Sequence, residues 1–202
     1  MSALEALAAS HPGSYPVQMA LGAALEASSP RDALAAYERA AALLPQATGE
    51  DSAHARIAAL ASTLDDTARA AAAYAQLTAH DPADVASARA WTRLVDPAAD
   101  PATARIALSR LVGVDPFDAD AHSTLGRLQL AAGETEAAVR AFTVALAAGP
   151  LDRASAHADL AESLVAAGRP ADAKRQTLHA LEIAPTYARA QELLLRLVEG
   201  SR

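Results

Sequence analysis

Residues 119–152 read ADAHSTLGRLQLAAGETEAAVRAFTVALAAGPLD, and this stretch decides the fold. Ala138 and Phe142 are four residues apart, so they lie on the same face of one predicted helix. Gly126 lies on a preceding predicted helix, where its small size lets the two backbones approach closely. Pro150 ends the second helix, because the residue before a proline avoids the helical region. The stretch therefore predicts a helical hairpin.

The same pattern recurs along the whole chain. Prolines follow one another at intervals of 34 to 37 residues, at Pro45, Pro82, Pro116, Pro150 and Pro185. Alanine stands twelve residues before each of them, at Ala33, Ala70, Ala104, Ala138 and Ala173. Eight residues before each proline stand Tyr37, Tyr74, Leu108, Phe142 and Thr177. A period of about 34 residues indicates an array of helical repeats.

This repeat resembles the tetratricopeptide repeat (TPR), whose unit is a 34-residue helical hairpin, and the resemblance covers nearly the whole chain. It implies an all-α, right-handed superhelical solenoid of about five hairpins, forming a single domain over 1–202. We expect the hairpins at 14–47, 51–84, 85–118, 119–152 and 154–187, followed by a C-terminal capping helix over 188–199. Ala190, Leu194 and Val198 are expected on the inner face of that last helix.

Some positions depart from the family pattern. Histidine occupies the slot of the family's early tryptophan in three repeats, at His54, His122 and His157. Since consecutive repeats lie roughly 10 Å apart, these side chains are too far from one another to share a metal ion. We expect them to be half-buried packing residues. Trp91 stands where the motif has leucine, and we expect it in the core as well.

The composition excludes several classes of function. The 202 residues carry a net charge of −7, which disfavours binding to nucleic acid. Without cysteine there is no disulfide or thiolate chemistry. The sequence shows no long apolar run and no signal-peptide pattern, so we expect no membrane insertion and a cytoplasmic location by default. Since catalytic and metal-binding motifs are absent, we expect no enzyme activity, no cofactor and no metal.

In the TPR family the first helix of each hairpin lines a concave, partner-binding groove. Carrying the family's groove slots over to this chain gives Arg56, Arg89, Arg93, Ser123, Arg127, Leu130, Asp159 and Glu162. Because an arginine fork matches a carboxylate well, the four arginines predict a peptide ligand with acidic residues or a free C-terminus. The end of the groove with Asp159 and Glu162 would take a basic residue. The alternative is that the arginines are solvated or paired with neighbouring carboxylates.

The resemblance favours a non-catalytic scaffold that binds a peptide or partner protein. One alternative is a structural TPR module of a larger multidomain bacterial protein, packing against that protein's other domains. Leu4, Leu7 and Pro12 repeat the offsets of a second helix with no first helix before it, and we therefore expect a piece of a longer chain. Another alternative, an RNA-binding helical repeat, is disfavoured by the acidic net charge.

Replacing Phe142 with alanine tests the repeat frame. If Phe142 fills the seam of its hairpin, Phe142→Ala should lower the free energy of unfolding by about 3–5 kcal/mol, as for other buried aromatic residues. Thermal melting followed by circular dichroism measures the change, and an unchanged melting temperature would show that the frame is misplaced.

Overall fold

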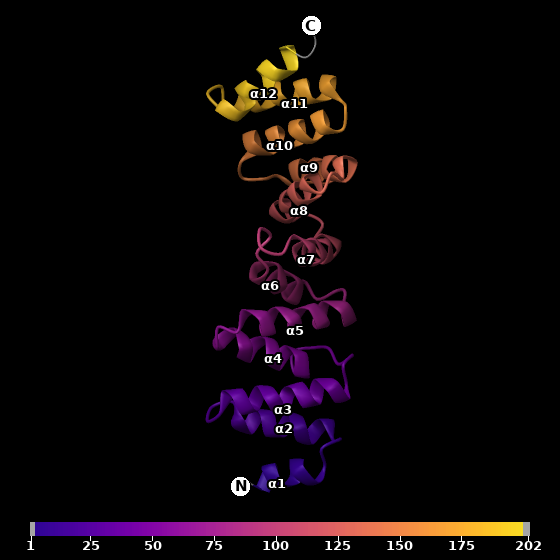
Figure 1. Cartoon of the computed structure of the whole chain (residues 1–202), viewed down its shortest axis with the longest axis vertical. Coiled ribbons are helices and arrows are strands. Elements are labelled where there is room, and N and C mark those ends of the chain that lie inside the picture. Colours follow the sequence, from indigo (N-terminus) through magenta and orange to yellow (C-terminus); the bar gives the residue numbers. More distant parts are fainter. Residues whose placement is uncertain (1–2, 200–202) are drawn as a thin grey trace. The chain divides into compact units, whose positions relative to one another are not determined.

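The computed structural model describes residues 3–199, and this part of the chain consists of twelve α-helices without a β-strand (Figure 1). The first six are α1 (Ala3–Ser10), α2 (Tyr15–Leu25), α3 (Pro30–Leu43), α4 (Ala53–Thr63), α5 (Thr67–His80) and α6 (Val85–Leu94). The other six are α7 (Pro101–Val114), α8 (Ala119–Ala131), α9 (Thr135–Ala148), α10 (Arg153–Ala166), α11 (Pro170–Ile183) and α12 (Ala188–Glu199). The predicted all-α repeat fold is confirmed.

The chain divides into two compact units, Met1–Asp96 (unit 1) and Pro97–Arg202 (unit 2). In unit 1, α2 pairs with α3 and α4 with α5, while α1 packs on α2 and α6 on α5. In unit 2, α8 pairs with α9 and α10 with α11, while α7 packs on α8 and α12 on α11. The two helices of the predicted hairpin 85–118 thus belong to different units. A single solenoid over 1–202 stays a prediction.

The helix boundaries follow the local chemistry of the sequence. Helices α3, α7 and α11, each the second helix of a predicted hairpin, begin with a proline, at Pro30, Pro101 and Pro170. The missing N–H of proline costs nothing in the first turn of a helix. Gly133 and Gly168 turn the chain between paired helices with φ of 78° and 72°, the left-handed conformation that glycine adopts without strain. Aspartate side chains cap five helices by accepting a backbone N–H bond, at Asp66, Asp84, Asp100, Asp118 and Asp152.

In two of the helix pairs, α2–α3 and α8–α9, the helices approach each other at a glycine that lies against an aromatic ring. A methyl group on Gly126 would lie only 2.9 Å from two ring carbons of the buried Phe142. A methyl group on Gly22 would lie 2.5 Å from a ring carbon of Tyr37. Even alanine is therefore too large at these two positions while the ring keeps its place.

The prediction for the inner face of α12 is wrong in part. Ala190 is buried, but Leu193 is also buried, at 2% exposed, whereas Val198 is 38% exposed. Leu197 packs against the core cluster that includes Phe142. The reason is that α12 contacts α10 as well as α11. The covered face of α12 therefore consists of Ala190, Leu193 and Leu197, which are spaced i, i+3, i+7 along the helix. The prediction for Trp91 is confirmed, because it is buried in unit 1.

Gly126→Ala should destabilise unit 2 by about 1–3 kcal/mol, because the added methyl group overpacks the seam against Phe142. Gly113→Ala is the matched control. A Cβ atom there meets nothing within 4 Å, so this helical alanine should stabilise the protein by about 0.5–1 kcal/mol. Chemical denaturation of both variants gives the sign of each change, and the same sign in both would contradict the packing argument.

Candidate functional site

The candidate site lies on three neighbouring helices of unit 2. Helix α10 contacts both α8 and α12, so the first helices of consecutive repeats form one continuous face. Two hollows open on this face. The first hollow, of about 270 Å³, is lined by residues of α8, of the connection between α9 and α10, and of the first part of α10. The second hollow, of about 310 Å³, is lined by residues of α8, α10 and α12, with the ring of Phe142 from α9.

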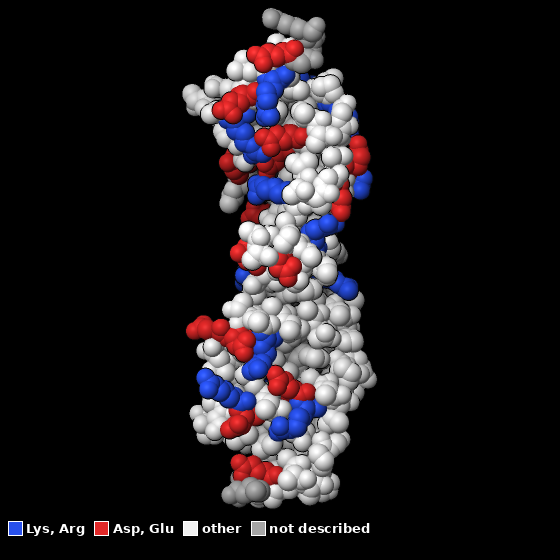
Figure 2. Space-filling view, in the orientation of Figure 1, with Lys and Arg blue, Asp and Glu red and all other residues white. Residues whose placement is uncertain are grey.

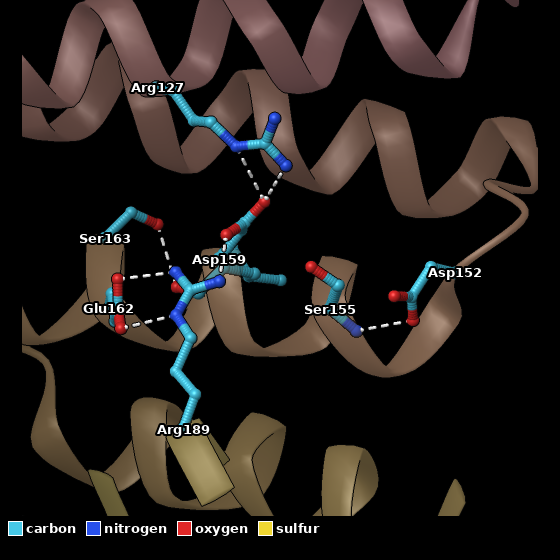
Figure 3. A network of polar contacts seen from close by, with 8 residues as sticks. Arg127, Asp152, Ser155, Asp159, Glu162, Ser163 and Arg189 are labelled. Atoms are coloured by element: carbon cyan, nitrogen blue, oxygen red, sulfur yellow. Dashed lines mark hydrogen bonds and ion pairs between the residues drawn. The ribbon is translucent and has the colours of Figure 1, made fainter. Parts of the chain in front are cut away.

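A network of four charged side chains holds the three helices together at this face (Figure 3). Arg127 of α8 donates from Nη2 to Oδ2 of Asp159 at 2.8 Å and from Nε to the same oxygen at 3.2 Å. Arg189 of α12 lies 2.7 Å from the other oxygen, Oδ1, of Asp159. It also donates to both carboxylate oxygens of Glu162, at 2.8 and 2.6 Å. The network links α8 to α12 through α10.

Asp159 is the central residue of this network, because it pairs with both arginines, and its side chain is only 3% exposed. A buried carboxylate is tolerated when it is paired and hydrogen-bonded, and both oxygens of Asp159 have an arginine partner. Removing either arginine would leave a buried oxygen without that partner. The ion pairs therefore fix the side chain of Asp159 between the two hollows.

The pKa values of the Arg189–Glu162 pair reflect their mutual hydrogen bonds. The bonds from Arg189 lower the pKa of Glu162, an effect that burial partly opposes. The bonds to Glu162 are the main cause that raises the pKa of Arg189; burial opposes them, and the bonds to Asp159 raise the pKa further. Both groups thus keep their charges near neutral pH. Sequence reasoning missed Arg189. It lies four residues after Pro185, the same offset at which Asp120, a residue that lines the first hollow, follows Pro116.

Each groove residue predicted in unit 2 lines at least one of the two hollows. Ser123 lines the first hollow, whereas Leu130 and Glu162 line the second. Arg127 and Asp159 line both. Unit 2 therefore brings together five predicted site residues. Figure 2 shows blue and red side chains next to one another over the part of the surface formed by α10–α12.

The other predicted arginines belong to unit 1 and are treated by themselves. Arg56 of α4 pairs with Asp51 at 2.9 Å, so the alternative of a neighbouring carboxylate partner holds for it as it does for Arg127. Arg89 and Arg93 are exposed and lie one turn apart on α6, which places them on the same helix face.

The histidines in the tryptophan slot mostly serve the connection between repeats. Nε2 of His54 donates to the carbonyl oxygen of Pro45, and Nε2 of His122 donates to that of Pro116, each at 3.1 Å. Burial lowers the pKa of His54. His157 differs, because its Nδ1 lies 2.8 Å from Oε1 of Gln176. His54 and His122 are buried and His157 is half-buried, so all three are packed to the predicted degree or more.

Within residues 3–199, no three histidine, aspartate or glutamate side chains are grouped as ligands for a metal ion. None of the helices between residues 3 and 199 has the length and apolar character that crossing a membrane requires.

Acid should weaken the contribution of Glu162 to stability. Its folded-state pKa lies below the unfolded value of about 4.3, so the contribution is complete above that value and is lost as the pH falls through the folded pKa. The stability difference between the wild type and Glu162→Gln should be constant above about pH 6 and shrink in acid. Urea unfolding from pH 7 to pH 3 measures it, and a difference that stays constant throughout would contradict the assignment.

The sequence matches no family model. No curated protein matches it either. Solved structures are similar to it. The crystal structure of MamA has 24% identity and a TM-score of 0.59, covering 72% of this chain and 84% of MamA. YrrB, described as a TPR protein with an unusual peptide-binding site, has 16% identity and a TM-score of 0.54, covering 95% of this chain and 97% of YrrB.

PilF of Pseudomonas aeruginosa has 18% identity and a TM-score of 0.51, covering 92% of this chain and 83% of PilF. At these identities the likeness concerns the fold. The chain has the fold of the tetratricopeptide-repeat proteins, as its 34-residue frame predicts.

Proposed function

We propose that the chain is a non-catalytic interaction scaffold that binds an extended peptide segment of a partner protein on the concave face of unit 2. The observation that carries the proposal is the pair of hollows on α8, α10 and α12, which share Arg127 and Asp159. Five of the predicted groove residues line them. A continuous face with two adjacent hollows suits successive side chains of one ligand.

The dimensions of the hollows favour side chains over a cofactor. Each has a volume near 300 Å³ or less, at the lower end of the range of small-molecule pockets, about 300–1,000 Å³. Their linings combine charged groups with apolar side chains such as Leu130 and Leu151. A polypeptide offers both kinds of group at regular intervals. YrrB, which shares the fold, is described as having a peptide-binding site, and this likeness supports a protein or peptide ligand here.

Arg89 and Arg93 support a separate contact in unit 1. Both are exposed on one face of α6, and an arginine pair of this kind suits a carboxylate. We therefore keep the proposal that acidic residues or a free C-terminus of the partner bind there. Replacing both arginines with alanine tests this contact independently of unit 2.

Selection of a displayed peptide library on the whole chain tests the proposed function. Selected peptides should lose at least about tenfold in affinity when Ser155→Trp fills the first hollow. Glu136→Trp is the matched control, because Glu136 is exposed on α9 and lines neither hollow. Fluorescence anisotropy measures the affinities. Equal binding to both variants would place the ligand elsewhere and refute the proposal.

A further inference from the structure

The ion pair between Arg127 and Asp159 separates the two hollows, and its two side chains differ in how strongly other residues fix them. Asp159 is buried, and Arg189 fixes one of its oxygens. Arg127 has 58% of its side chain exposed, and both of its bonds go to the single oxygen Oδ2 of Asp159. Arg189, in contrast, is held by two carboxylates. Arg127 is therefore the removable member of this ion pair.

Turning Arg127 toward solvent would leave Oδ2 of Asp159 without the arginine that binds it. A charged acceptor that loses its donor in a buried position is costly, so a donor carrying positive charge is favoured there. A planar guanidinium supplies two adjacent N–H groups, the same groups that Arg127 now supplies. Arg127 thus occupies the position that a guanidinium from a ligand would take.

The charges around the first hollow favour a cation. Asp120, Asp152 and Asp159 line it together with Arg127, so the formal charge of the lining is −2, from three carboxylates and one guanidinium. The start of α10 contributes about +0.5 from its dipole, which leaves the lining negative. A positive ligand group therefore gains from the whole hollow and not only from Asp159.

We propose that an arginine side chain of the bound peptide replaces Arg127 on Asp159, and that Arg127 acts as an internal competitor until the peptide arrives. The inference rests on the proposed function and names its ligand class, an extended peptide with an arginine flanked by apolar residues. Once Arg127 has turned away, the two hollows join into one cleft. Leu151, which is fully exposed, and Leu130 then offer apolar contacts on either side of the ion pair.

Three capped hexapeptides test the exchange. They are identical except for one central residue between two leucines, which is arginine, citrulline or glutamate. Isothermal titration with the whole chain should show the arginine peptide binding at least about tenfold more tightly than its neutral citrulline analogue. Arg127→Ala should strengthen binding of the arginine peptide by about two- to fivefold, the gain expected on removing a half-exposed ion pair.

Arg140→Ala is the matched control, because Arg140 is exposed on α9 and lines neither hollow. It should leave the affinity unchanged. Circular dichroism melting shows whether each variant keeps its fold. In the wild type, the ¹H–¹⁵N signal of the Arg127 Nε–H group should shift when the arginine peptide is added, because that group leaves Asp159.

Three results would overturn the inference. In the first, Arg127→Ala binds the arginine peptide more weakly than the wild type does. In the second, the wild type prefers the glutamate peptide and Arg127→Ala has lost this preference. Either result would mean that Arg127 itself binds the ligand and does not compete with it, and neither would contradict the proposed function. The third is binding of none of the hexapeptides to either form. The proposed function itself is judged separately, by whether Ser155→Trp blocks library-selected peptides.

Discussion

The close approach of the two helices within each hairpin is the constraint on which the rest of the structure depends. In the hairpin of α8 and α9, the ring of Phe142 lies where a side chain on Gly126 would be. The core is otherwise rich in alanine, which buries little area per residue, so it depends on short distances between backbones for its dispersion contacts. Separating the helices to admit one methyl group would loosen the contacts along the whole seam.

The hairpins solve this constraint with different pairs of residues. Where the first helix has alanine at the glycine slot, the second helix has a smaller or less buried partner. Thr177 follows Ala161 at the same distance in sequence as Phe142 follows Gly126, and it is fully buried but smaller than phenylalanine. Tyr74 follows Ala58 at this distance too, and it is only partly buried. The combined volume of the two side chains in the seam is therefore limited, and either side of the seam can supply the smaller residue.

The sequence predicted the repeats and their helices, because proline, alanine and glycine act locally and recur with the period. The family's groove slots also led to five residues that line the two hollows of unit 2. It could not predict which charges pair. Asp159, Glu162 and Arg127 come from two helices, and Arg189 from a third, so their ion pairs depend on tertiary geometry. The buried face of α12 was misjudged for a related reason, because its contact with α10 moves Val198 outward and Leu193 inward. The division between α6 and α7 falls within the predicted hairpin 85–118, in which Trp91 stands in place of the motif leucine, and the repeat frame alone did not predict it.

The connection between α3 and α4 has a practical consequence for protein engineering. The bond from His54 to the carbonyl oxygen of Pro45 spans nine residues, whereas the equivalent bonds of His122 and Gln191 span six. The three additional residues thus bulge out while the same hydrogen bond closes the joint. Since the free energy of closing a loop rises only slowly with its length, residues 46–51 form a permissive point for inserting a tag, a fluorescent label or a second domain. Such an insertion would keep the spacing of the neighbouring helices.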